Sequence, residues 1–164
     1  MRALSCLLQQ LPRRSASTAD ADLLLRTLRK APADAEPLPY EERILVESAW
    51  QSYRQGDVVP LEGAQASAQR SVSVREASGW DAVAARSAHD ELGQMEVAIR
   101  RQMLAGLRRL LTGRRSNVHR YPDLEPPTWT LHDGSWQLVL RCSRQEREIV
   151  VLRARQLRSA AMTV

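Results

Sequence analysis

The region from residue 127 to residue 155 alternates between apolar and polar side chains, and this pattern constrains the fold more than any other feature of the chain. A period of two is typical of β-strands that bury one face. Turn-like stretches at residues 132–135 and 143–146 divide the region into three runs, and the first contains Asp133 followed by Gly134, a strong hairpin signal. We therefore predict a three-stranded antiparallel meander with one apolar face: Trp129, Leu131, Trp136, Leu138, Leu140, Ile149 and Val151.

A helix over residues 95–111 is predicted directly before the meander. Its apolar side chains recur at helical spacing, and most of its arginines fall on the opposite side. Residues 71–75 alternate and predict a short strand, and residues 80–92 have a helical pattern. Together these elements predict an α+β fold, in which two helices pack on a small antiparallel meander sheet that follows a helical N-terminal extension.

The N-terminal part of the chain contains helical patterns that prolines separate. Helices are expected over residues 20–30 and 40–55, followed by an extended stretch at 58–62. Residues 1–19 hold arginines and serines but no acid, a composition that suits a targeting segment; a frayed N-terminus is the alternative. We divide the chain into a disordered N-terminus, a helical segment and a folded domain: residues 1–19, 20–65 and 70–158.

The chain is basic, with 24 lysine and arginine residues against 19 acidic ones and a net charge of +5. Lys30 is the only lysine, so the charge comes from arginine, which forms bidentate contacts with phosphate. A GC-rich genome produces the same skew, and a solvated helix face is the alternative to a binding surface. We predict that one basic cluster binds nucleic acid or the ribosome through phosphates: Arg100, Arg101, Arg108, Arg109, Arg114, Arg115 and Arg120.

The sequence contains no recognisable cofactor or metal motif. Cys6 and Cys142 have neither metal-binding nor disulfide spacing, which fits a reducing cytoplasm, and Cys142 continues the apolar alternation as a core thiol. His119 and His132 fall in a loop and a hairpin and are expected to be exposed. No apolar run approaches the roughly 20 residues of a membrane helix. We expect no cofactor, no metal ion and no membrane association.

The order strand, two helices, basic loop and meander resembles the RelE/ParE superfamily of type II toxins over residues 70–158. The helix at 99–110, the hairpin at 129–140 and the last strand at 148–155 carry this resemblance. It implies ribosome-dependent cleavage of mRNA, in which positive side chains stabilise the phosphate transition state. The residues assigned to catalysis are three strand arginines and a histidine that acts as a weak acid–base group: Arg141, Arg153, Arg155 and His132.

Several positions depart from the family pattern. Gln137 stands where an arginine usually follows the hairpin aromatic residue, and Thr130 and His132 replace arginines common in the strand before the turn. No tyrosine follows Tyr121, and Gln156 and Leu157 replace the final basic pair. The expected protein is therefore either an endoribonuclease or a degenerate toxin that has lost this activity. The alternatives are a non-catalytic basic module that binds RNA or DNA, and an inhibitor directed at gyrase.

Residues 36–62 resemble the C-terminal tail of the antitoxins that pair with these toxins. Such tails wrap the toxin with a helix and an extended strand. The resemblance implies a toxin neutralised in cis, whose segment 40–62 packs on the downstream domain and buries these residues: Ile44, Leu45, Trp50 and Val58 or Val59. The expected partners are the ribosome with mRNA, or another nucleic acid, and a separate cognate antitoxin. An unrelated helical extension is the alternative.

Overall fold

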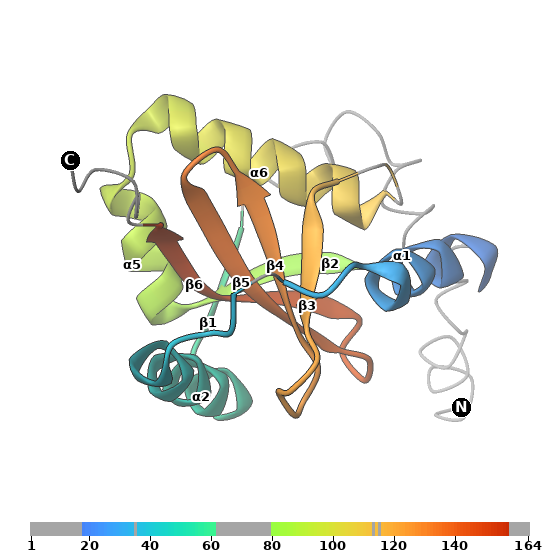
Figure 1. The fold of residues 1–164 in the computed structure, drawn as a ribbon, viewed down its shortest axis with the longest axis horizontal. Helices are drawn as coiled ribbons and strands as arrows, with labels where there is room; N and C mark the ends of the chain where they lie inside the picture. Colours follow the sequence, from blue (N-terminus) through green and yellow to red (C-terminus); the bar gives the residue numbers. More distant parts are fainter. Residues whose placement is uncertain (1–17, 35, 62–79, 113, 115, 158–164) are drawn as a thin grey trace, which may run out of the picture.

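One mixed β-sheet organises the part of the chain that the structure, a computed structural model, describes: residues 18–34, 36–61, 80–112, 114 and 116–157. The strands are β1 (Val58–Pro60), β2 (Asp81–Ala85), β3 (Val118–Tyr121), β4 (Thr128–Asp133), β5 (Trp136–Ser143) and β6 (Glu148–Gln156). The helices are α1 (Thr18–Lys30), α2 (Tyr40–Arg54), α5 (Arg86–Gln94) and α6 (Val97–Leu111). Figure 1 shows α5 and α6 above the sheet and α2 below it.

The strand order across the sheet is β1-β2-β6-β5-β4-β3. Strands β3 to β6 pair antiparallel with their neighbours in sequence, whereas β2 lies parallel to β6 and β1 pairs antiparallel with the other edge of β2. The predicted α+β class is confirmed. The prediction of a small antiparallel sheet is wrong, because the sheet is mixed and has six strands.

Strand β2 occupies the start of the region that we predicted as a helix over residues 80–92. Asp81–Ala85 is extended, and α5 begins only at Arg86. Ala82 and Ala84 belong to one core cluster, whereas Val83 and Ala85 belong to the other. A strand covered on both faces shows no period of two, and its alanines favour a helix when the sequence is read alone. The strand predicted at residues 71–75 and residues 1–17 lie outside the described residues.

The first core cluster packs α1, α5 and α6 against one face of the sheet. It contains the alternating apolar residues of β4, β5 and β6, as predicted. Trp129 belongs to this cluster, and its Nε1 donates a hydrogen bond to the carbonyl oxygen of Leu28 at 2.8 Å. Trp136 and Cys142 are partly buried against the same cluster. The expected core placement of these residues is therefore confirmed.

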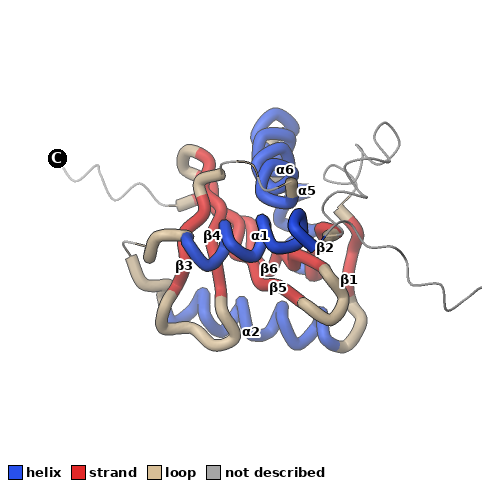
Figure 2. Tube along the Cα trace, turned by 90° about the vertical axis from the view of Figure 1, so that its right-hand side faces the viewer, coloured by secondary structure: helices blue, strands red, loops and turns tan. Residues whose placement is uncertain are grey.

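The second core cluster lies between α2 and the opposite face of the sheet (Figure 2). Val46 and Ala49 are buried there, and Trp50 is partly buried. Ile44 and Leu45 are 51% and 44% exposed, so the prediction that they are buried is wrong. The buried side of α2 consists of Val46, Ala49 and Trp50, which follow the helical spacing i, i+3, i+4. The prediction took Ile44 and Leu45, just before Val46, as buried and therefore placed the buried side at a different angle around the helix axis.

Further contacts attach α2 and β1 to the sheet. The hydroxyl of Tyr53 donates to Oε2 of Glu148 in β6 at 2.6 Å, and burial raises the pKa of Tyr53 to about 12. Val58 and Val59 are partly buried in β1, where Val58 packs against the second cluster. Within the described segments, no helix has both the length and the apolar character needed to cross a membrane.

Candidate functional site

The sheet face that α2 covers carries a group of polar and charged side chains among its apolar residues. They come from β4, β5 and β6 because they alternate with the apolar residues of the first cluster. Gln137 pairs with Arg155 across β5 and β6, and a register shift between Val139 and Leu140 marks a β-bulge beside Arg153. We call Arg141, Arg153 and Arg155 together the arginine face. These are the three arginines that the sequence assigned to catalysis.

Arg141 is the most deeply buried member of the arginine face, with 1% of its surface exposed. Its Nε donates to Oγ1 of Thr128 at 2.9 Å, and its Nη2 donates to Oε1 of Glu47 in α2 at 2.5 Å. Its guanidinium carbon also lies 5.5 Å from the centroid of the Trp50 ring, within cation–π range. Its Nη1 has no hydrogen-bond partner among the described residues. Glu47 is therefore the carboxylate that balances this buried charge.

Arg153 and Arg155 are paired with carboxylates from the helices. Nε of Arg153 donates to Oε2 of Glu42 at 3.1 Å, and its Nη1 forms an ion pair with Glu91 in α5. Nε of Arg155 donates to Oε1 of Gln137 at 2.7 Å, and its Nη1 lies 3.8 Å from Oε1 of Glu42. Both side chains are 17% exposed. The structure thus brings the predicted catalytic arginines together, but each one contacts a carboxylate of α2.

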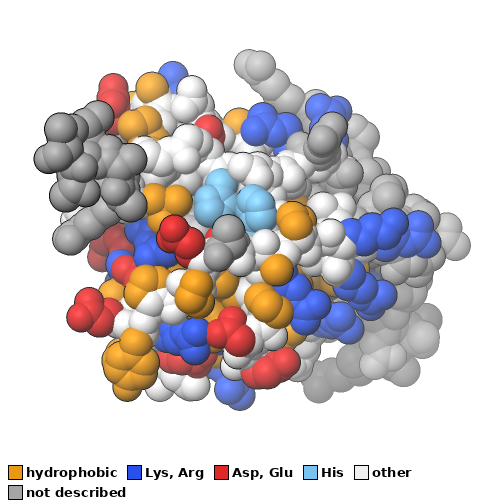
Figure 3. All heavy atoms as spheres, in the orientation of Figure 1, with side chains coloured by type: hydrophobic (Ala, Val, Ile, Leu, Met, Phe, Trp, Pro, Cys, Tyr) orange, Lys and Arg blue, Asp and Glu red, His pale blue; other side chains and the backbone are white. Residues whose placement is uncertain are grey.

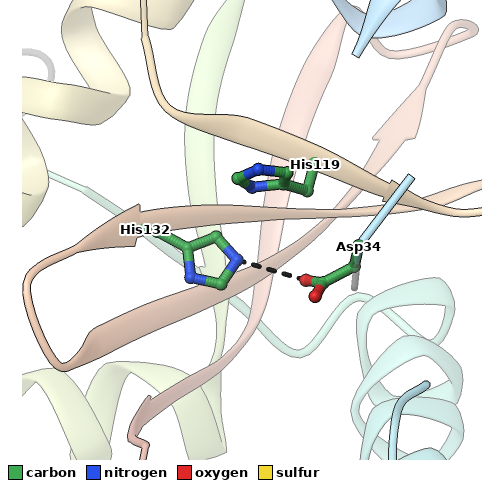
Figure 4. Close-up of side chains that lie close together, drawn as sticks. All are labelled: Asp34, His119 and His132. Atoms are coloured by element: carbon green, nitrogen blue, oxygen red, sulfur yellow. Dashed lines mark hydrogen bonds and ion pairs between the residues drawn. The ribbon is translucent and has the colours of Figure 1, made fainter. Parts of the chain in front are cut away.

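His132, the fourth predicted catalytic residue, lies at the end of β4 in a different polar cluster. Its Nε2 is 3.2 Å from Oδ2 of Asp34 (Figure 4). The same nitrogen is 3.0 Å from Oγ1 of Thr130 and 3.4 Å from Nε2 of Gln137. The side chains of His132 and Asp34 are only 16% and 12% exposed. The prediction that His132 is exposed is therefore wrong, because the loop between α1 and α2 covers this end of β4.

Asp34 is held as a carboxylate by its hydrogen bonds. Burial alone opposes its ionisation, but the backbone N–H of Glu36, the hydroxyl of Thr130 and the ring of His132 outweigh this effect. The pKa of Asp34 therefore lies below its usual value. The same polar network continues to the arginine face, because Gln137 contacts both His132 and Arg155.

His119 completes a three-residue cluster with Asp34 and His132. It lies on β3 and is partly buried, so the expectation of an exposed side chain is again wrong. The two imidazole rings meet edge to face, with centroids 4.8 Å apart, and Nδ1 of His119 is buried without a hydrogen-bond partner among the described residues. One potential ligand atom from each of the three side chains lies within 4.8 Å of the others. Figure 3 shows histidine side chains reaching the surface near the centre of the view.

Sequence analysis missed this cluster and expected no metal ion. Asp34 and His132 are 98 positions apart, so no local spacing connects them. The backbone brings them together: N–H groups of Asp34 and Arg120 donate to the carbonyl oxygens of Arg120 and Pro32, each at 2.8 Å. His132 also lines an open pocket of about 580 Å³ beside α6. The remaining signal was the pair of histidines on the neighbouring strands β3 and β4, where the register places His119 opposite Thr130, two residues before His132.

The predicted nucleic-acid residues lie away from the arginine face, on α6, the loop after it and β3. The structure places Arg101, Arg109 and Arg114 in exposed positions, and Arg100, Arg108 and Arg120 in partly exposed ones. Arg115 lies outside the described residues. Because α6 packs on the face opposite α2, these arginines and the arginine face form no common rim.

Comparison with known proteins gives no match: neither a family model, nor a curated protein, nor a solved structure matches the chain. The geometry of the site therefore has to support any functional conclusion. That geometry offers two polar centres: an arginine face paired with helix carboxylates, and a cluster of one carboxylate and two imidazoles beside a pocket.

Cys142 gives a first testable expectation. Burial raises the pKa of its thiol from 9.0 to about 12. Because the thiolate is the reactive form, alkylation by iodoacetamide at pH 8 should be about a thousandfold slower in the folded protein than in urea. A Cys6→Ser variant leaves Cys142 as the reporting thiol. A folded-state rate within tenfold of the unfolded rate would contradict the burial that we describe.

Proposed function

We propose that the protein is a RelE/ParE-like toxin-fold protein whose N-terminal segment neutralises it in cis. The observation that carries this proposal is the contact between α2 and the arginine face. Glu42 and Glu47 supply carboxylates to all three arginines that the sequence assigned to catalysis. Phosphate would need the same guanidinium donors, so these carboxylates compete directly with RNA.

The arrangement of the elements supports the proposal. Residues 81–156 run as a strand, two helices, a basic loop and antiparallel strands, the order on which the resemblance rests. Residues 40–60 run as a helix that covers the sheet and a strand that extends its edge. This is the helix and extended strand expected of an antitoxin tail.

The electrostatics explain why the full chain would be inactive. An arginine can contact a phosphate only when its guanidinium group is accessible. Such contacts favour binding because they release counterions from the nucleic acid. Arg141 is inaccessible beneath α2, and Arg153 and Arg155 are mostly covered. We therefore propose ribosome-bound mRNA as the target once α2 is displaced. Cleavage is the proposed activity, and RNA binding without cleavage is expected if Gln137 marks a degenerate site.

Expression of residues 66–164 with and without residues 1–65 in trans tests the proposal. The shorter fragment alone should arrest growth and reduce intact ribosome-bound mRNA, and residues 1–65 should restore growth. A fragment 1–65 carrying Glu42→Ala and Glu47→Ala should restore growth much less, because the arginine face stays uncovered. The toxicity of the shorter fragment should disappear with Arg141→Ala plus Arg155→Ala.

A matched control uses two exposed arginines that belong neither to the arginine face nor to the predicted nucleic-acid cluster. Arg86→Ala plus Arg144→Ala removes the same charge and should leave toxicity intact. A folded fragment 66–164 that neither slows growth nor binds mRNA would contradict the proposal. Growth arrest with intact mRNA and inhibited DNA supercoiling would instead identify gyrase as the target.

The exposed arginines of α6 favour a second candidate, a non-catalytic module that binds RNA or DNA. Arg101, Arg109 and Arg114 are accessible in the folded chain, unlike the arginine face. The full-length protein would then bind nucleic acid with a steep salt dependence. Loss of that binding in an Arg101→Ala plus Arg109→Ala variant, together with a fragment 66–164 that binds but never cleaves, would favour this candidate.

A further inference from the structure

We propose that Asp34, His119 and His132 bind one divalent transition-metal ion of the Zn²⁺ class. His132 also belongs to the residues assigned to catalysis, and Gln137 links the cluster to Arg155, but the metal-site proposal rests on the geometry of the cluster and not on the toxin activity. Imidazole nitrogens and a carboxylate oxygen are the ligands that Zn²⁺ and related ions take in proteins. The three side chains converge from the α1–α2 loop, β3 and β4 (Figure 4).

The distances in the cluster are close to those that a metal ion requires. Ligands bound at about 2.0–2.1 Å in a tetrahedral site lie about 3.4 Å from one another. Nε2 of His132 and Oδ2 of Asp34 are already 3.2 Å apart. The three candidate ligand atoms lie within 4.8 Å of one another, so the longest separation must shorten by no more than about 1.4 Å. A movement of this size is within the range of side-chain rotation.

The hydrogen bonding of His119 favours this interpretation over a purely structural histidine pair. Its Nδ1 is buried without a partner among the described residues, and its ring meets His132 edge to face. A buried polar nitrogen without a partner is costly, and a metal ion or a water molecule that it recruits would remove the cost. Asp34 contributes a carboxylate oxygen, Oδ2, that lies 3.2 Å from Nε2 of His132.

The surroundings determine what kind of site this is. Three protein ligands leave a fourth position for water or a ligand, which is the arrangement of open rather than closed zinc sites. The side chains of His132 and Asp34 keep 16% and 12% of their surface exposed, so an exchangeable ligand can reach the cluster from solvent. The nearest arginine in the same network, Arg155, lies beyond Gln137 and is paired with Glu42. Glu42 therefore partly balances the charge of Arg155, which reduces the repulsion between Arg155 and a bound cation.

Isothermal titration of the full-length, metal-free protein with ZnCl₂ tests the proposal. All proteins carry Cys6→Ser, which removes a competing thiol, and none carries a histidine tag. We expect one equivalent of Zn²⁺ to bind with micromolar or tighter affinity. His119→Ala and Asp34→Asn should each weaken binding at least tenfold, since even partners of metal ligands contribute 10–100-fold. The matched control is His89→Ala, because His89 lies on α5 and is the one other histidine of the chain.

Two outcomes would overturn the proposal. One is the absence of Zn²⁺ binding by the parent protein at 100 µM, a concentration about a hundredfold above a micromolar Kd. The other is binding by His119→Ala that equals that of His89→Ala. If a ligand variant fails to fold, the absorption spectrum of the parent protein loaded with Co²⁺ tests the proposal instead. Visible absorption typical of four-coordinate Co²⁺ that one equivalent of Zn²⁺ abolishes supports the site, and a spectrum of hydrated Co²⁺ rejects it.

Discussion

Glu47→Ala is expected to lower the free energy of unfolding by about 2–3 kcal/mol. The substitution removes the carboxylate that Arg141 contacts at 2.5 Å and leaves a guanidinium that is 1% exposed without its counter-charge. The estimate lies below the 3–5 kcal/mol typical of fully buried pairs because the side chain of Glu47 is 48% exposed. Urea denaturation followed by circular dichroism measures the change.

The matched variant is Arg141→Met, which removes the charge and fills similar volume. It should cost less than Glu47→Ala, because it leaves no buried charge. The groups that lose a donor are the hydroxyl of Thr128 and the carboxylate of Glu47, whose side chain is 48% exposed and can be hydrated. The double variant should be no less stable than Glu47→Ala alone. If Arg141→Met is the more destabilising of the two variants, the Arg141–Glu47 pair makes a net favourable contribution to the free energy of unfolding.

Leu152→Ala is expected to lower the free energy of unfolding by about 3–4 kcal/mol. Leu152 is fully buried on β6 within the second cluster, beneath α2. Its truncation leaves a cavity between helix and sheet that rigid strands close only in part. The loss should appear as a lower urea midpoint with an unchanged m-value.

Leu45→Ala is the control for this truncation. It removes the same atoms from a leucine of α2 that is 44% exposed, so we expect a loss of less than about 1 kcal/mol. A loss at Leu45 equal to that at Leu152 would mean that α2 packs on its other side, as the sequence had suggested. The comparison therefore tests the orientation of α2 as well as its contact with the sheet.

The elements that could be predicted are those whose two sides differ in side-chain chemistry. In β5, apolar Leu138 and Leu140 alternate with polar Gln137 and Arg141, so the strand and its apolar face were recognisable although α2 buries the polar face as well. Helix α6 was recognisable because its apolar residues recur on one side and most of its arginines lie on the other. Both signals are present in the element's own sequence.

The elements that could not be predicted depend on distant parts of the chain. Ala82 and Ala84 form a strand because β6 offers an open edge and helices cover both faces, and no local pattern encodes either condition. The rotation of α2 about its axis depends on the position of buried Arg141, whose partner Glu47 points toward the sheet. That contact joins residues 94 positions apart.

The candidate sites also contain a part that the local sequence predicts and a part that depends on distant segments of the chain. The predicted arginines proved to share one face because strand alternation fixes which side chains lie together. Asp34 was invisible to sequence reasoning because its role depends on a loop that pairs with β3 through backbone hydrogen bonds. The burial of His132 follows from that loop and not from its hairpin position.

The order of the elements along the chain also determines the order in which the opposite charges are synthesised. Glu42 precedes Arg153 by 111 positions, and Glu47 precedes Arg141 by 94. A ribosome adds about 5–20 residues per second, so the carboxylates exist several seconds before the guanidinium groups that they will contact. Every finished molecule then carries one copy of the acidic helix α2 and one copy of the sheet with its arginines. Unlike two separately expressed proteins, such a chain keeps its ratio of acidic helix to basic sheet through any change in expression level or degradation.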